Sequence, residues 1–194
     1  MVASGSYDRT VRLWEAEDGR PLATLTGHAG GVRGVALSGD GRLVASGGLD
    51  GTVRLWHAET GRALATLTGH AGGAWGVALS GDGGLVASGS YDGTVRLWEA
   101  EGGRALATLT GHAGGAWGVA LSRDGRLVAS GGVDGTVRLW NTSSGDLRRS
   151  LRPERRYEGL DITMLTGVTE AQRQALLALG AVERTGPPRP GRTG

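Results

Sequence analysis

A unit of 42 residues is repeated along most of this chain. Residues 27–68, GHAGGVRGVALSGDGRLVASGGLDGTVRLWHAETGRALATLT, return almost unchanged as residues 69–110, and a third copy with a drifting end begins at Gly111. The same step separates the tryptophans that end the TVRLW runs, which are Trp14, Trp56, Trp98 and Trp140. A fixed period of this length predicts a repeat architecture, in which each unit buries its apolar surface against its neighbours.

Glycine-rich turns divide each unit into short segments with strand character. The first full unit predicts strands over residues 32–38, 43–47, 52–57 and 63–68, and Gly-Asp-Gly at 39–41 marks the first hairpin. An antiparallel sheet of this size is only marginally stable alone, because both of its faces need cover. Radial stacking of the sheets provides that cover, so the pattern predicts an all-β chain of the β-propeller type.

The composition excludes several classes of protein. The chain has no cysteine, which excludes a disulfide framework, a thiol nucleophile and a cysteine-ligated zinc. All 21 basic residues are arginine, and we interpret this bias as that of a GC-rich genome. A nucleic-acid site is disfavoured, since acidic residues are interspersed with the arginines. No apolar run approaches the ~20 residues of a membrane helix, and the N-terminus lacks a secretory signal, so we predict a cytoplasmic protein.

The motifs within the unit resemble those of the WD-repeat β-propeller family. The Gly-His pair, the run Ser-Gly-x-x-Asp-Gly-Thr-Val-Arg-Leu-Trp and the unit length carry this resemblance over roughly residues 2–151. The residue after each Trp departs from the usual Asp and is Glu15, His57, Glu99 or Asn141. The resemblance implies about four blades, with strands a, b, c and d running outward from a central channel. The blades would cover residues 1–26, 27–68, 69–110 and 111–151.

The chain opens in the middle of a unit. Met1 occupies the position of Leu43 in the repeat, so the partial blade 1–26 should lack its inner strand and the Gly-His pair. This opening predicts a fragment of a longer array or a truncated reading frame. Family blades suit a ring of about seven or eight, and an open arc exposes strand edges. We therefore expect either a homodimer that closes an eight-blade ring or aggregation.

Residues 152–182 form a tail outside the repeat pattern. Thr169 and Gln172 form a capping-box signature, and Gly180 is a stop signal, which together predict a helix over about residues 170–179. Residues 183–194 should be a disordered end. The sequence of this tail resembles that of the tail in bacterial WD-repeat proteins that are often fused to NACHT-like ATPases. Residues 159–167 align with 31–39, and so they could supply the inner strand that blade 1 lacks; the alternative is a loop over the edge of the propeller.

The Ser, His and Asp of each unit could suggest a catalytic triad. The resemblance assigns them instead to a structural network in which the His, held by Asp and Ser, reaches the Trp indole N–H. Three copies of one hydrolytic site would be unusual, and no Gly-x-Gly run opens a helix as a phosphate site requires. We therefore predict no enzyme, no metal and no cofactor. The network residues are His28, Ser46, Asp50 and Trp56; His70, Ser88, Asp92 and Trp98; and His112, Ser130, Asp134 and Trp140.

The positions at which the repeats disagree point to a partner-binding rim. Two of them coincide with family positions at the upper rim of the channel, and they carry the aromatic and Arg side chains that dominate binding hot spots. The alternative is that the tryptophans pack as core, but Arg33 at the equivalent position opposes burial. The rim residues are Tyr7, Arg33, Leu49, Trp75, Tyr91, Trp117 and Val133.

These observations favour a non-catalytic scaffold. We predict a WD-repeat propeller segment of a bacterial signalling or sensor protein that binds a protein or peptide at its rim. A purely architectural fragment without a partner, and a sensor of a peptide or small ligand, are the alternatives.

Overall fold

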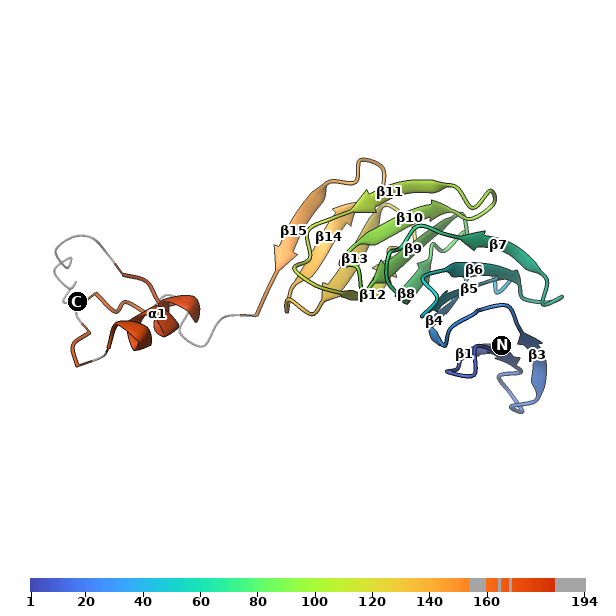
Figure 1. Cartoon of the computed structure of the whole chain (residues 1–194). Coiled ribbons are helices and arrows are strands. Elements are labelled where there is room, and N and C mark those ends of the chain that lie inside the picture. Colours follow the sequence, from blue (N-terminus) through green and yellow to red (C-terminus); the bar gives the residue numbers. More distant parts are fainter. Residues whose placement is uncertain (154–159, 164, 168, 184–194) are drawn as a thin grey trace. The chain divides into compact units, whose positions relative to one another are not determined.

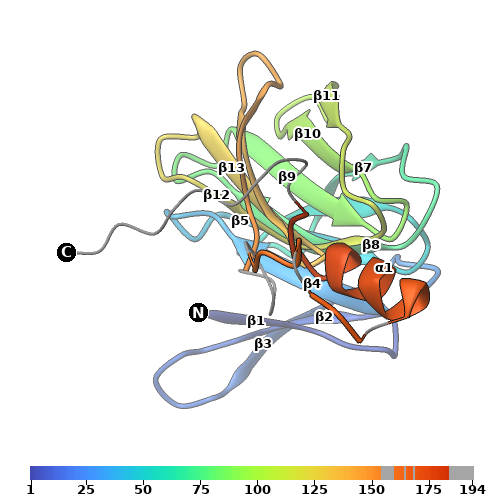
Figure 2. The same ribbon diagram turned by 90° about the vertical axis from the view of Figure 1, so that its left-hand side faces the viewer.

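Four antiparallel sheets follow one another along the first unit of the chain, Met1–Arg152 (Figure 1). The computed structural model describes residues 1–153, 160–163, 165–167 and 169–183. We number the sheets as blades 1 to 4 in chain order. Figures 1 and 2 show the dark blue strands of blade 1 at one end of the series. The second unit, Pro153–Gly194, is described separately below.

The strands agree with the repeat pattern to within one residue at each end. Blade 1 has three strands and the others have four, in the order predicted, with the first strand of each four-stranded blade as its inner strand. Blade 1 contains β1 (Val2–Gly5), β2 (Val11–Trp14) and β3 (Pro21–Leu25). Blade 2 contains β4 (Val32–Leu37), β5 (Leu43–Gly48), β6 (Val53–His57) and β7 (Ala63–Leu67). Blade 3 contains β8 (Ala74–Leu79), β9 (Leu85–Ser90), β10 (Val95–Glu99) and β11 (Ala105–Leu109). Blade 4 contains β12 (Ala116–Leu121), β13 (Leu127–Gly132), β14 (Val137–Asn141) and β15 (Leu147–Leu151).

The turn between the second and third strands of a blade needs a left-handed residue. Gly51 has φ 78° in blade 2, and the glycines at the same position in blades 3 and 4 are also at positive φ. Blade 1 has Arg9 there, at φ 72°. A side chain in this region is disfavoured sterically, which explains why the full repeats use glycine.

The hydrophobic core consists of three clusters, each between two successive blades. In the first cluster, Leu13 and Leu25 of blade 1 pack with Val44 and Trp56 of blade 2. The equivalent residues of blades 2 and 3, and of blades 3 and 4, form the other two clusters. Burial of each large side chain is worth about 1.5–3 kcal/mol. The blades are therefore stabilised by their neighbours, as expected for a repeat protein.

Glycine in the second strand of a blade lets the next blade approach closely. A Cβ on Gly47 would lie 2.9 Å from the carbonyl oxygen of Ala74, and one on Gly89 would lie 2.7 Å from the carbonyl oxygen of Ala116. Backbone atoms cannot move aside as a side chain can. The equivalent Gly131 of blade 4 has nothing within 4 Å. This face of blade 4 thus lacks the neighbour that its counterparts have.

The second unit contains the helix α1 (Glu170–Ala178), which confirms the prediction of a short C-terminal helix. Thr169 caps it in a capping box with Gln172. Arg173 donates to the carbonyl oxygens of Ile162 and Leu165, which joins the helix to the segment before it. No helix in the described ranges is long and apolar enough to cross a membrane.

A parallel bridge between Asp161 and Val182 lies beside this helix. The N–H of Ile162 donates to Val182, and the N–H of Val182 donates to Leu160, both at 2.9 Å. The proposed closure strand therefore bonds within its own unit on one edge; its residues 159 and 164 lie outside the described residues, and its pairing with blade 1 stays a prediction. All of the predicted disordered end except Glu183 also lies outside the described residues.

Candidate functional site

A buried chain of hydrogen bonds joins four segments of blade 2. His28 precedes β4, Ser46 lies in β5, Asp50 in the following turn and Trp56 in β6. The Ser46 hydroxyl lies 2.8 Å from Nε2 of His28 and accepts from the Trp56 indole N–H at 2.9 Å. Nδ1 of His28 lies 3.0 Å from a carboxylate oxygen of Asp50. The network therefore ties the segment before the inner strand to the second and third strands.

Blades 3 and 4 repeat these contacts with the same geometry. The His–Ser separations are again 2.8 Å and the Trp–Ser hydrogen bonds again 2.9 Å. The structure thus places all twelve predicted network residues in three separate clusters. It adds a member that the sequence reasoning missed, a threonine two residues after each Asp, whose hydroxyl donates to the carboxylate. These residues are Thr52, Thr94 and Thr136.

One contact in the predicted network is wrong. The His was expected to reach the indole N–H directly, but in each blade the serine oxygen lies between the two rings. The centroids of the His28 and Trp56 rings are 6.4 Å apart. A hydroxyl group can donate one hydrogen bond and accept others, and so Ser46 can serve both partners at once.

Burial sets the protonation state of this network. Desolvation lowers the pKa of His28 and of His70, so both rings are neutral at pH 7. Burial alone would raise the pKa of Asp50, but hydrogen bonds from Thr52 and from the Ala29 N–H outweigh it and lower that pKa to about 2. The ionised Asp50 only accepts, and so Nδ1 of His28 must donate to it. Nε2 then accepts from the Ser46 hydroxyl, which leaves every member satisfied.

Three of the predicted rim residues lie on β-bulges of the inner strands. The register between β4 and β5 shifts between Val32 and Gly34, and so Arg33 is the bulged residue. The same shift occurs at Trp75 and at Trp117. A bulge redirects a side chain out of the regular alternation of a strand. These three side chains are therefore presented in the same way by three successive blades.

The bulged side chains stack on one another across blade boundaries. The guanidinium carbon of Arg33 lies 4.3 Å from the Trp75 ring centroid and 5.1 Å from that of Tyr7. Arg33 also donates a hydrogen bond to the Tyr7 hydroxyl. Trp75 stacks on Trp117, with centroids 5.3 Å apart and planes 13° apart, and lies beside Tyr91. We call these five residues the rim stack.

The rim stack is largely accessible to solvent. Trp117 is 46% exposed, Arg33, Tyr7 and Tyr91 are exposed, and Trp75 is half-buried. The remaining predicted rim residues, Leu49 and Val133, are also exposed. The tryptophans are thus not part of the clusters between the blades, in which they were the alternative candidates.

Comparison with known protein families identifies the repeat. The family model described as "WD domain, G-beta repeat" matches residues 1–15, 19–57, 61–99 and 103–141, more than half of the chain. The chain belongs to the WD-repeat family. Single WD repeats of larger proteins are similar to it. Examples are "Nuclear distribution protein PAC1" of Mycosarcoma maydis (50% identical over 42 residues), "Ribosome assembly protein 4" of Chaetomium thermophilum (49% over 41) and "F-box-like/WD repeat-containing protein TBL1X" of Mus musculus (52% over 42). These matches cover 21–22% of this chain and 8–9% of those proteins.

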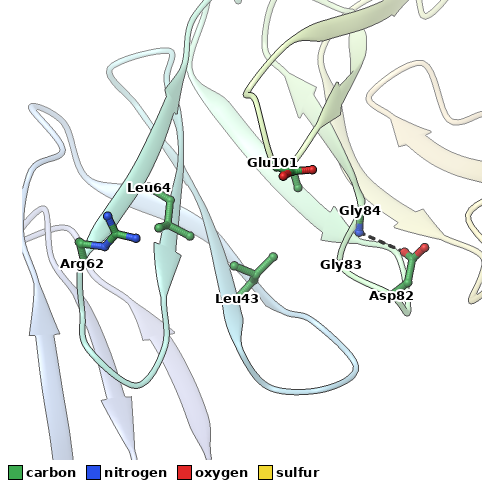
Figure 3. A pocket seen from close by; sticks show the side chains of 8 residues that line it. Leu43, Arg62, Leu64, Asp82, Gly83, Gly84 and Glu101 are labelled. Atoms are coloured by element: carbon green, nitrogen blue, oxygen red, sulfur yellow. Dashed lines mark hydrogen bonds between the residues drawn. The ribbon is translucent and has the colours of Figure 1, made fainter.

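A pocket of about 490 Å³ lies between the WD repeats of blades 2 and 3, and no residue of the rim stack lines it (Figure 3). Gly84, on its wall, stands where the neighbouring repeats have Arg42 and Arg126, and so no side chain projects there. The lining includes carboxylates and one guanidinium but no histidine, serine or threonine. It therefore offers no hydroxyl nucleophile beside a histidine base. The lining residues are Leu43, Arg62, Leu64, Asp82, Gly83, Gly84, Ala100 and Glu101.

The WD-repeat network has no access to a substrate. Ser46 is fully buried, and its oxygen already accepts from Trp56. Across the part of the chain that the structure describes, no group of three or more His, Asp and Glu side chains is placed to hold a metal ion. The arrangement is suited to holding strands together.

We expect acid to destabilise the WD repeats in two stages. The lowered pKa values of His28 and His70 favour the folded state above pH ~6.5, the value of an unfolded histidine, and this contribution is lost as the pH falls below it. The pKa values of Asp50 and Asp92, both about 2, add stability that is lost as the pH falls from ~4 toward 2. Urea unfolding at pH 7.5, 5.5 and 3.5 should give free energies that decrease in this order.

Two variants test the assignment of the acid-labile groups. Asp92→Asn should be less stable than wild type at pH 7.5 and should lose less stability below pH 4, because its side chain no longer titrates. The control Asp18→Asn replaces an exposed aspartate outside the network and should follow the wild-type profile. Equal unfolding free energies for the wild type at pH 7.5 and 5.5 would contradict the role of the buried histidines.

Proposed function

We propose that this segment is a non-catalytic scaffold whose rim stack binds a protein or peptide. WD-repeat domains are typically interaction scaffolds, and the chain belongs to this family. The observation that carries the proposal is the exposed stack of Arg33, Trp75 and Trp117 on three equivalent bulges. Such side chains offer a large, rigid contact area at a low cost in conformational entropy.

Stacking within the rim gives this surface a fixed shape before any partner arrives. The Arg33 guanidinium is held between the rings of Tyr7 and Trp75, and Trp75 is held against Trp117. A preorganised surface loses less side-chain entropy on binding. A preformed stack of aromatic rings fits a peptide segment with apolar side chains.

We expect Trp117→Ala to abolish most of the binding without changing stability. The partner is obtained by selecting peptides from a random display library on the wild-type chain. Loss of an aromatic contact worth about 2 kcal/mol would raise the Kd of a selected peptide about 30-fold. Because Trp117 is 46% exposed and outside the core clusters, the melting temperature should change little. Fluorescence anisotropy measures the Kd and calorimetry measures melting.

Leu106→Ala is the matched control, because Leu106 is 43% exposed on β11 and lies outside the rim stack. It should leave the Kd unchanged. Selected peptides that bind wild type and Trp117→Ala equally would contradict the proposal that the rim stack is the binding surface. They would favour a purely architectural segment. A large fall in melting temperature for Trp117→Ala would indicate that the indole has a structural role instead.

We also propose that the segment serves a cytoplasmic bacterial signalling or sensor protein. The resemblance of the tail to that of bacterial WD-repeat proteins fused to NACHT-like ATPases supports this assignment. An ATPase module in the reading frame of the intact gene would agree with it. An intact gene without any effector module would contradict it.

The homodimer is a further proposal for the same segment, independent of the rim stack. Two copies with four blades each would close an eight-blade ring, a number found among propellers. Closure would cover strand edges that otherwise invite pairing with other chains.

A further inference from the structure

One face of blade 4 exposes side chains whose equivalents in the other blades are buried. Leu25, Leu67 and Leu109 occupy the last position of the outermost strand and are 2–3% exposed, whereas the equivalent Leu151 is 44% exposed. The valines that pair with Leu25, Leu67 and Leu109 are 0% exposed, whereas Val137, which pairs with Leu151, is 43% exposed. Leu139 is likewise half-buried, although its counterparts are fully buried. We call Val137, Leu139 and Leu151 the leading face.

The opposite surface is found on blade 1. The valine at the second position of the second strand is fully buried in blades 2 to 4, in the junction with the preceding blade, but the equivalent Val2 is 50% exposed. Trp14 is half-buried, whereas Trp56, Trp98 and Trp140 are 1–3% exposed. We call Val2 and Trp14 the trailing face.

The leading and trailing faces are the two halves of the junction that this chain makes internally. Between blades 1 and 2, Val11, Leu13 and Leu25 meet Val44 and Trp56 in one cluster. The same residue types meet between blades 2 and 3 and between blades 3 and 4. Val137, Leu139 and Leu151 match the first half of that cluster, and Val2 and Trp14 match the second half.

We infer that the leading face of one copy docks on the trailing face of a second copy. This inference rests on the proposed pairing and names its surfaces. The occupant is a second copy because its trailing face carries the same Val and Trp that cover this surface in the three internal junctions. Head-to-tail contacts of this kind form a closed ring when the rotations from blade to blade add up to a full turn. Two copies in such a ring meet at two identical junctions.

The docking contact runs along the outer strands. Blade 1 has no inner strand, so a second copy brings no counterpart of β4 to the inner part of blade 4. A Cβ on Gly118 or Gly131 would have no atom within 4 Å, and this inner surface stays uncovered in the pairing. The apolar contact is therefore made by Val137, Leu139 and Leu151 with Val2 and Trp14.

The full chain is tested by its mass in solution, using light scattering behind a sizing column. Leu151→Arg places a charge on the leading face, and Val2→Asp places one on the trailing face. Each change disrupts both junctions of the ring, so each variant alone should be monomeric, with a dimer Kd at least about 100-fold above that of wild type. An equimolar mixture should regain the dimer mass, because one junction is then unaltered and the other pairs Arg with Asp. Leu106→Arg, at a similarly exposed leucine of blade 3, is the control and should stay dimeric.

Each failure has a distinct meaning. A monomeric wild type overturns the pairing and the inference together. If the Val2→Asp variant remains dimeric, the copies pair but the trailing face is not the surface that meets the leading face. A mixture that fails to regain the dimer mass has the same meaning. Polymers that grow with concentration overturn the closed ring. Peptide binding by the rim stack is measured separately, so none of these outcomes bears on it.

Discussion

Replacing Gly89 with alanine is expected to destabilise the chain strongly, although it adds a single methyl group. The new Cβ would lie 2.7 Å from the carbonyl oxygen of Ala116, an atom of the next blade's backbone. Relief requires that blades 3 and 4 separate along their whole junction, which weakens the packing of Trp140 on Leu97 and Leu109. Overpacking in a core costs about 1–3 kcal/mol, and we expect the upper end because the obstacle is main chain.

Gly131→Ala is the matched control, since it makes the same change at the equivalent position of blade 4. Nothing lies within 4 Å of this Cβ, and the residue is not at positive φ. Alanine should therefore be neutral or add about 0.4–1 kcal/mol by restricting the unfolded chain. Urea unfolding monitored by tryptophan fluorescence compares the two variants. Equal losses of stability would mean that the junction does not determine the effect.

Ser88→Ala should remove the centre of one buried network and cost about 2–6 kcal/mol. The Ser88 hydroxyl accepts from the Trp98 indole N–H at 2.9 Å and lies 2.8 Å from Nε2 of His70. Its loss leaves two buried polar groups without a partner, and each such group costs about 1–3 kcal/mol. Ser88 is fully buried, so water cannot replace the hydroxyl without disturbing the packing. The free energy of unfolding from urea titration measures the effect.

Ser4→Ala in blade 1 is the internal control for this experiment. Ser4 accepts from the Trp14 indole N–H at 2.8 Å, as Ser88 does from Trp98, but blade 1 has no histidine and Ser4 is exposed. Solvent can replace this hydrogen bond, and so the cost should be below about 1 kcal/mol. A similar cost at both positions would show that the histidine and the burial add nothing to the network.

The strands could be predicted from the sequence almost to the residue, because three near-identical units fix both period and turns. Gly51 and its counterparts mark turns that need positive φ, and the TVRLW runs mark the third strands. The absence of an inner strand in blade 1 followed from the place of Met1 in the unit. Each copy of the repeat thus predicts the same strands and turns, and the agreement between the copies fixes their boundaries.

The site was less accessible to sequence reasoning, because its geometry depends on register. The residue types of the rim stack were predictable, but the bulges that project Arg33, Trp75 and Trp117 arise from a one-residue shift between neighbouring strands. The order of contacts in the network was also mistaken, since a pattern of residue types does not state which group lies between two others. The bridge from Asp161 to Val182 involves one pair and leaves no alternating pattern to detect.

The junction between blades has a consequence for how this gene can change. Since each junction joins the same residue types, an in-frame loss of residues 69–110 would bring blade 2 against blade 4 with the same kinds of contact. Gly47 would then face the backbone of Ala116, and Arg33 would meet Trp117 in place of Trp75. Unequal recombination between near-identical repeats would thereby alter the number of blades and the composition of the rim stack in a single event. Evolution of new binding specificity in such a chain need not pass through a misfolded intermediate.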